Sequence, residues 1–163
     1  MLSIEITDIR KFTQMLFSGT EFDRFLLHDL TLSTAVATTI DGRKNEAFYS
    51  DEEKEHFLKE PYVSWEELRP FVTELIRGKR LPVSFKIVLL TSSRTTEAMV
   101  QKAGFTDCAV SSLSLNILFR EKQLFLTNGI SYLGFSMDKS LEQYWDKTMK
   151  SFLEGKDCGY RQV

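Results

Sequence analysis

The sequence predicts an α+β domain with a mostly antiparallel sheet and helices packed on one side of it. Three observations lead to this prediction. Apolar residues recur at every second position in several stretches, which is the period of a strand with one buried face. Other stretches carry apolar residues three and four positions apart, the period of an amphipathic helix. The 163 residues, 42% hydrophobic and 27% charged, have the size and composition of one compact domain.

The first third of the sequence predicts three strands, with a helix between the first and the second. Residues 1–6 alternate between apolar and polar side chains, and residues 8–17 carry one apolar helix stripe. Residues 25–40 keep a strand alternation throughout, so we expect one long strand there. Because sixteen residues is long for a single strand, we also expect a bulge or bend near Asp29–Thr34. Asp41-Gly42 is typical of a two-residue turn, after which residues 43–49 would return as the partner strand.

The middle of the chain predicts two helices with well-marked beginnings. Ser50 and Ser64 each precede a glutamate by three positions, the capping box in which each side chain satisfies the other residue's backbone amide. We therefore expect helices over residues 51–59 and 65–77, and Gly78 ends the second.

Strands dominate the remainder. Residues 83–91 are apolar on both faces, which predicts a central strand. Glu121-Lys122 and Asn128-Gly129 are expected to form the turns between later strands. The other expected elements are a helix over 92–103, strands over 111–120, 123–128 and 130–137, a helix from 138 to 155, and a mobile tail over 156–163.

We expect a single domain over residues 1–163. Its parts are a first α/β half over 1–50, an acidic helical insert over 51–78, a second α/β half with the terminal helix over 79–155, and the tail. Both halves have the order strand, helix, strand, strand, which predicts two related units. The insert holds 8 acidic and 4 basic residues, so the acidic charge is concentrated there.

Overall charge and apolar pattern exclude several classes. The 21 Lys and Arg against 23 Asp and Glu give a net charge of −2, which is no general nucleic-acid signature. No apolar run approaches the roughly 20 residues of a membrane helix, so no membrane partner is expected. Glu5 and Asp8 stand where a signal peptide would be basic and then apolar, and Cys108 and Cys158 form no close pair. These features predict a reducing, cytoplasmic location.

The motifs of common enzyme chemistries do not occur in the sequence. It has no Gly-x-Ser-x-Gly elbow, no P-loop and no Gly-x-Gly-x-x-Gly, so we expect no cofactor and assign no catalytic or metal-binding residue. His28 and Asp29 are neighbours in a predicted strand, where they would point to opposite faces and form no dyad. His56 shares a helix face with glutamates, which could bind a divalent ion weakly or be solvated.

The basic residues provide the candidate binding site. Arg77-Gly78-Lys79-Arg80 is the densest cluster, and it either stabilises the carboxyl end of a helix or contacts phosphate. Cations on the first helix and on the helix after the central strand could extend a basic surface. The candidate nucleic-acid-binding residues are Arg10, Lys11, Arg77, Lys79, Arg80, Arg94 and Lys102.

The 13 phenylalanines fall mostly on predicted inner faces, which favours core packing over base stacking. The inner set is Phe12, Phe25, Phe71, Phe85, Phe119, Phe135 and Phe152. The free edge of a strand such as 43–49 or 130–137 is a candidate site for dimerisation or for addition of a peptide strand.

Three stretches resemble a family of small bacterial proteins of unknown function, and the likeness covers nearly the whole chain. They are Trp65-Glu-Glu-Leu-Arg-Pro-Phe71, Leu75-Ile-Arg-Gly-Lys79, and Met137-Asp-Lys-Ser-Leu-Glu142 before Trp145-Asp146. This resemblance implies no activity, ligand or catalytic residue.

The repeated order of elements is also similar to the half-domain of DNA sliding clamps. Ile40-Asp41 and Phe135-Ser-Met-Asp138 resemble the ends of clamp strands, whereas the acidic insert and the terminal helix depart from that pattern. We therefore expect a non-catalytic binding or assembly module that forms a homo-oligomer and could bind nucleic acid. The alternatives are a small enzyme or metal-binding protein using His28 or His56, and a peptide-binding scaffold using a sheet edge.

Overall fold

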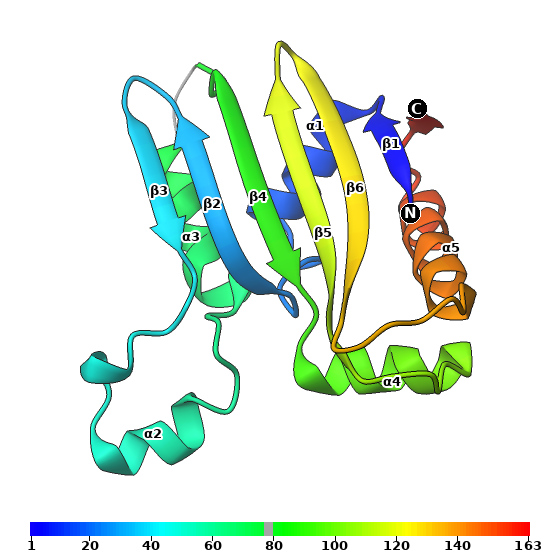
Figure 1. Cartoon of the computed structure of the whole chain (residues 1–163). Helices are drawn as coiled ribbons and strands as arrows, with labels where there is room; N and C mark the ends of the chain where they lie inside the picture. Colours follow the sequence, from blue (N-terminus) through cyan, green and yellow to red (C-terminus); the bar gives the residue numbers. More distant parts are fainter. Residues whose placement is uncertain (77–79) are drawn as a thin grey trace.

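The computed structural model describes residues 1–76 and 80–163. Within them, seven strands form one antiparallel sheet in the order β3-β2-β4-β5-β6-β1-β7 (Figure 1). The strands are β1 (Ser3–Ile6), β2 (Leu26–Ser33), β3 (Ala37–Asp41), β4 (Ser84–Leu90), β5 (Val110–Arg120), β6 (Gln123–Tyr132) and β7 (Tyr160–Gln162). The helical segments are α1 (Ile9–Thr13), η1 (Gln14–Ser18), η2 (Glu46–Phe48), α2 (Asp51–Phe57), α3 (Trp65–Leu75), α4 (Ser93–Ala103) and α5 (Ser140–Gly155). The predicted α+β class is confirmed.

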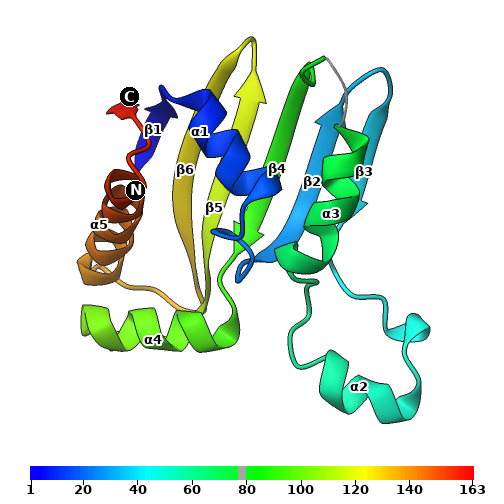
Figure 2. The ribbon, with the colours of Figure 1, turned by 180° about the vertical axis from the view of Figure 1, so that it is seen from behind.

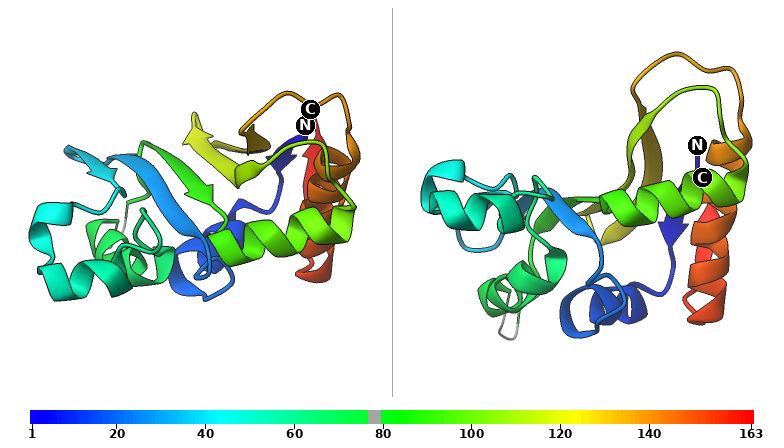
Figure 3. Two further views of the ribbon diagram at one scale, coloured as in Figure 1. Left: turned by 60° about the horizontal axis from the view of Figure 1, so that its bottom comes forward. Right: turned by 90° about the horizontal axis from the view of Figure 1, so that it is seen from below.

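Helices cover one face of the sheet. In Figure 2, α3 lies over β2 and β3, and α1 crosses in front of β4 and β5, while α5 stands beside β1. Helix α4 lies across one end of the sheet, and α2 stands away from it on an extended loop (Figure 3). The opposite face of the sheet is not covered by any helix in the described residues (Figure 1).

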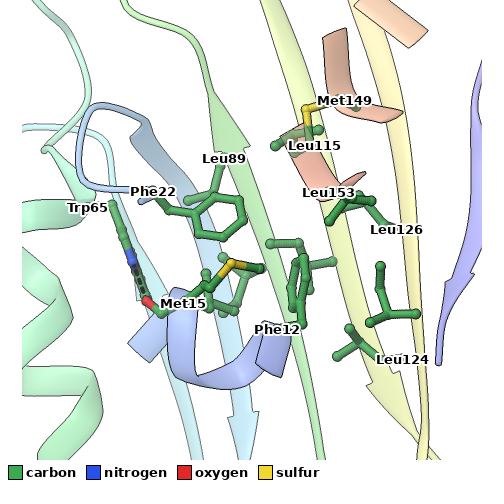
Figure 4. Close-up of a cluster of buried hydrophobic side chains, with 14 of the residues drawn as sticks. Phe12, Met15, Phe22, Trp65, Leu89, Leu115, Leu124, Leu126, Met149 and Leu153 are labelled. Atoms are coloured by element: carbon green, nitrogen blue, oxygen red, sulfur yellow. Dashed lines mark hydrogen bonds between the residues drawn. The ribbon is translucent and has the colours of Figure 1, made fainter. Parts of the chain in front are cut away.

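The core lies between the sheet and these helices. Strand alternation places Phe85, Ile87 and Leu89 of β4 on the inner face, where all three are buried. The helices supply the other side of the core, including Phe12 and Trp65 (Figure 4). The strand predicted over 83–91 has the expected central position, because β4 pairs with β2 on one side and with β5 on the other.

The long strand expected over 25–40 is a hairpin. Strands β2 and β3 pair around a turn at residues 34–36, with Ser33 opposite Ala37. Leu30 pairs with Ile40, so the even-numbered residues stay on the inner face through the turn and the apolar alternation continues unbroken. This continuity explains why the pattern resembled one strand.

The expected turn at Asp41-Gly42 and the return strand over 43–49 are therefore wrong. The Gly42 N–H donates to the His28 carbonyl at 3.0 Å, which extends the hairpin beyond β3. The chain then leaves the sheet as an arm, residues 43–62, that contains η2 and α2. An isolated bridge between Arg43 and Tyr62 closes the base of the arm.

A second expected turn, at Asn128-Gly129, is also wrong. Strand β6 runs through both residues, and Asn128 is buried. Its side-chain oxygen accepts from the Leu2 N–H at 2.8 Å and its amide donates to Asp146 at 2.7 Å. A residue type common in turns thus serves here as a buried hydrogen-bonding group.

The turn at Glu121-Lys122 is confirmed, with φ angles of 51° and 62°. The segment over 130–137 continues β6 only to Tyr132, and Phe135 beyond it is exposed, contrary to its predicted inner position. Phe71 on α3 is exposed as well.

The expected mobile tail instead contains β7, which pairs with β1. The order β-α-β-β does occur twice, as β1-α1-β2-β3 and β4-α4-β5-β6. Equivalent strands do not pair equivalently, however: β4 pairs with β5, whereas β1 pairs with β6 and β7. The predicted pair of clamp-like halves is therefore not confirmed.

Within the described ranges, no helix is both long enough and apolar enough to span a membrane.

Candidate functional site

The candidate site is a cleft on the helix-covered face, between α1 with η1 on one side and α3 on the other. Its volume is about 960 Å³, within the range of small-molecule sites. Figure 2 looks onto this face, where α1 and α3 stand apart over the sheet. The described lining residues are Ile9, Arg10, Thr13, Gln14, Phe17, Ser18, Thr73, Glu74, Ile76, Arg80, Leu81, Pro82, Phe85, Phe119 and Lys122.

The floor of the cleft is a row of three phenylalanine rings. Phe17 meets Phe85 edge to face, and Phe85 stacks on Phe119, both with ring centroids 5.3 Å apart. Phe85 and Phe119 come from the neighbouring strands β4 and β5, where they are directly paired. All three rings are buried, and their mutual packing fixes the small part of each that faces the cleft.

One wall is an unusual helix. The predicted helix over 8–17 is an α-helix only through Thr13, and η1 continues it as a π-helix, closed by the Gly19 N–H donating to the Gln14 carbonyl at 2.7 Å. π-helical turns are rare and frequently occur at functional sites. Gln14, Phe17 and Ser18 of this turn line the cleft.

Helix α3 holds the π-helical turn in place. The Trp65 indole N–H donates to the Leu16 carbonyl at 2.9 Å (Figure 4). The Thr73 hydroxyl contacts the Phe17 carbonyl at 2.7 Å, and it shares its one proton with the Arg69 carbonyl of its own helix at 2.8 Å. The last carbonyls of a helix have no donor within the helix itself. Helix α3 supplies donors to two such carbonyls of η1, those of Leu16 and Phe17.

Three cationic side chains surround the apolar floor. Arg10 belongs to α1, Arg80 precedes β4, and Lys122 lies in the turn between β5 and β6. Within residues 1–76 and 80–163, none of these three side chains forms a hydrogen bond or ion pair. The lining also includes one carboxylate, Glu74. The cleft therefore combines apolar walls with an excess of positive charge.

Of the five predicted cations that the structure describes, it brings together Arg10 and Arg80. Lys11 lies on α1 outside the lining, and Arg94 and Lys102 are on α4, at the end of the sheet (Figure 3). Arg77 and Lys79 lie outside the described residues. No pattern in the sequence points to Lys122, because its approach to the cleft depends on the pairing of β4 with β5.

His28 and Asp29 do interact, contrary to the expectation from strand alternation. The His28 Nδ1 and the Asp29 Oδ1 are 2.6 Å apart, and both side chains are partly exposed. The pairing of β2 with β4 shifts register between Leu27 and Asp29, so His28 is the extra residue of a bulge. A bulge interrupts alternation and can turn neighbouring side chains toward each other. The pair lies outside the cleft lining, and the Tyr62 ring is tilted against the His28 ring with centroids 5.1 Å apart.

The other reactive residue types do not form a site. His56 lies on the exposed α2 against Phe57. In the part of the chain that is described, no three His, Cys, Asp or Glu side chains converge in a way that could hold a metal ion. Cys108 is half-buried, and burial raises the pKa of the buried Cys158 thiol to about 11, which disfavours the nucleophilic thiolate.

A smaller cavity of about 260 Å³ lies between β6 and α5. Among its polar groups, the amino terminus pairs with Glu142, and Asn128 pairs with Asp146. These contacts connect the start of the chain and β6 to α5, which gives them a structural role.

Comparison with known proteins shows which family the chain belongs to. The model of a family of unknown function, DUF5721, matches residues 15–161. The chain belongs to this family. The match includes the three stretches whose resemblance to an unassigned family was noted from the sequence. No curated protein and no solved structure matches the chain. Membership of DUF5721 thus brings no assigned activity, and the resemblance to sliding clamps has no support from these comparisons.

Proposed function

We propose that the protein is a non-catalytic binding module whose cleft between α1 and α3 takes a small organic anion. The ligand class is a carboxylate or phosphate monoester carried on an aliphatic or aromatic body. The observation that carries this proposal is a set of three cations, Arg10, Arg80 and Lys122, that have no side-chain partner among the described residues and lie around a floor of phenylalanine rings.

The apolar lining favours a ligand with an apolar body. Phe85 and Phe119 form the floor, and Ile76 and the exposed Leu81 flank it. Covering apolar surface stabilises a complex by about 25 cal/mol per Å² before the cost of association. A purely polar ligand would leave this surface without a matching contact.

The cations favour an anionic group at one end of the ligand. A hydrogen bond to a charged partner contributes about 1.5–3 kcal/mol, and Arg10 and Arg80 would not first have to break a described ion pair. The described lining contains neither His nor Cys, the residue types most used as bases and nucleophiles, which supports binding rather than catalysis.

Calorimetric titration with octanoate, phenyl phosphate and neutral octanol tests the proposal. We expect octanoate or phenyl phosphate to bind one-to-one, and octanol to bind at least about tenfold more weakly than octanoate because it lacks the charge. Arg80→Ala and Arg10→Ala should each weaken binding of the anion roughly tenfold.

His28→Ala is the matched control, since His28 is exposed and lies outside the cleft. It should bind the anions as the unchanged protein does. Failure of both anions to bind, or equal affinity for octanol and octanoate, contradicts the proposal. Binding of duplex DNA at low salt without binding of either small anion would also contradict it, in favour of the predicted polyanion surface.

A further inference from the structure

We infer that the edge formed by β3 and the adjacent flank of α3 is a homodimer interface, through which two copies join their sheets around a two-fold axis. This inference concerns the opposite side of α3 from the cleft and does not depend on the proposed ligand. The sequence suggested residues 43–49 or 130–137 as edge strands, but neither segment is one. The strand at this edge of the sheet, next to β2, is β3.

The outer side of β3 has free backbone groups at alternate residues. Two hydrogen bonds fix which ones: Gly42 N–H to the His28 carbonyl, and Thr34 N–H to the Val36 carbonyl. With Leu30 opposite Ile40, even-numbered residues of β3 bond to β2. The N–H and C=O groups of Ala37, Thr39 and Asp41 consequently point away from the sheet.

This edge is short and carries one charge, Asp41 at its end, but it lacks the stronger protections against pairing. Residues 37–41 are Ala-Thr-Thr-Ile-Asp, with no Lys, no Pro and no bulge in the pairing with β2. Edge strands that remain unpaired in solution are usually shielded by such features. An unshielded, β-branched edge favours addition of another strand.

The neighbouring flank of α3 adds an apolar contact. Arg69 pairs with Asp23 and Thr73 with the Phe17 carbonyl, which orients that side of α3 toward η1. Leu68, Phe71 and Leu75, three and four positions apart, define the α3 flank on the other side, toward β3. Leu68 and Leu75 pack partly against the core, whereas Phe71 is 55% exposed.

A second copy of the chain fits the β3 edge in the register of its charged residue and in the geometry of the strand. Antiparallel pairing centred on Thr39 would place each Asp41 opposite the partner's Ala37, so no like charges meet across the strands. The same two-fold axis would bring the two α3 flanks together behind the joined sheet, because α3 lies over β2 and β3 (Figure 2). Each Phe71 would then be covered by the other copy, which is the self-complementarity of an isologous interface.

Sedimentation equilibrium of the full chain into the high-micromolar range tests this interface. We expect twice the chain mass for the unchanged protein. Thr39→Pro should weaken dimerisation at least about tenfold, because it removes an outward N–H while leaving the bonds of β3 to β2 in place. Phe71→Glu should weaken it similarly, since it puts like charges across the axis.

Thr39→Val and Arg80→Ala are the controls and should remain dimeric, because the first keeps the N–H and the second lies in the cleft. Thermal melting of each variant establishes that it is folded. A monomeric unchanged protein overturns the inference, and so does a dimer that persists in both Thr39→Pro and Phe71→Glu.

Discussion

Gly42 lies at the point where the arm leaves the sheet. A Cβ atom on it would stand 1.8 Å from the Leu27 carbonyl oxygen and 2.6 Å from the carbonyl carbon. These are backbone atoms of the bulged strand, which cannot rotate away as a side chain can. The residue is therefore required by the close approach of two backbones rather than by a turn.

Gly42→Ala should lower the free energy of unfolding by about 3 kcal/mol, the upper range for overpacked sites, because β2 must move away from residue 42. Urea denaturation measures the change. Gly155→Ala is the control: nothing lies within 4 Å of its added carbon, and stability should rise by up to about 1 kcal/mol. Unfolding of Gly42→Ala at the same midpoint as the unchanged protein would contradict the close packing at the bulge.

The residues that sequence patterns misplace are those whose role depends on distant partners. Asn128 and Gly42 are turn-type residues, yet Asn128 bonds to Leu2 and Gly42 to His28. Local propensity describes what a residue permits, whereas these contacts are fixed by the order of strands. The His28–Asp29 contact likewise depends on a bulge that alternation alone does not reveal.

At the level of elements, capping signals were the most reliable guide. Ser50 and Ser64 begin α2 and α3 as expected, each accepting a hydrogen bond from the amide three residues on. Pro70 is accommodated inside α3. The division of the first helix into α1 and η1 had no sequence signal, because the donors that stabilise the carbonyls of η1 come from α3.

Thr73→Val removes one of those donors while keeping the side-chain shape. The Phe17 carbonyl loses its hydroxyl partner, so we expect unfolding to become easier by about 1 kcal/mol and octanoate affinity to fall as η1 loosens. Denaturation and calorimetry measure the two effects.

Thr148→Val is matched to it, because the Thr148 hydroxyl donates to the carbonyl four residues earlier, as Thr73 does to Arg69, and contacts no other element among the described residues. This control should leave anion binding unchanged. Equal losses of affinity in both variants would show that α3 does not support the wall of the cleft.

Across the whole molecule, stability is unevenly distributed. Strands β4, β5 and β6 pair along nearly their full length and bury their inner face. None of the residues of α2 is buried against the described part of the chain. The arm is held mainly at its base and by Glu60, which accepts from the Ser93 N–H at the start of α4 at 2.9 Å.

Hydrogen exchange should therefore separate the two regions. Amides of α2 are expected to exchange nearly as fast as in an unfolded peptide, and amides of β4 and β5 only on global unfolding. Mass spectrometry of peptic fragments measures both. Strong protection of α2 in the purified protein would indicate that the arm packs against something, and would contradict its isolation from the sheet.

The class of the fold followed from periodicity, but the order of strands did not. Alternation marks which face of a strand is buried, and leaves open which strands are neighbours. The cleft could not be predicted without the strand order, because Phe85, Phe119 and Lys122 are brought together by the pairing of β4, β5 and β6. The proposed dimer edge could not be predicted either, because β3 becomes an edge strand only through the β2–β3 hairpin, and the unbroken alternation does not reveal that hairpin.

The position of β1 has a consequence for biosynthesis. Its hydrogen-bonding partners are β6 and β7, so residues 3–6 wait for residues 124–127 and 160–162 to leave the ribosome. Long sequence separation of this kind slows the search for native pairs. Strand β1 thus stays unpaired while the residues between it and β6 are synthesised, and this side of the sheet is completed only when β7 has followed.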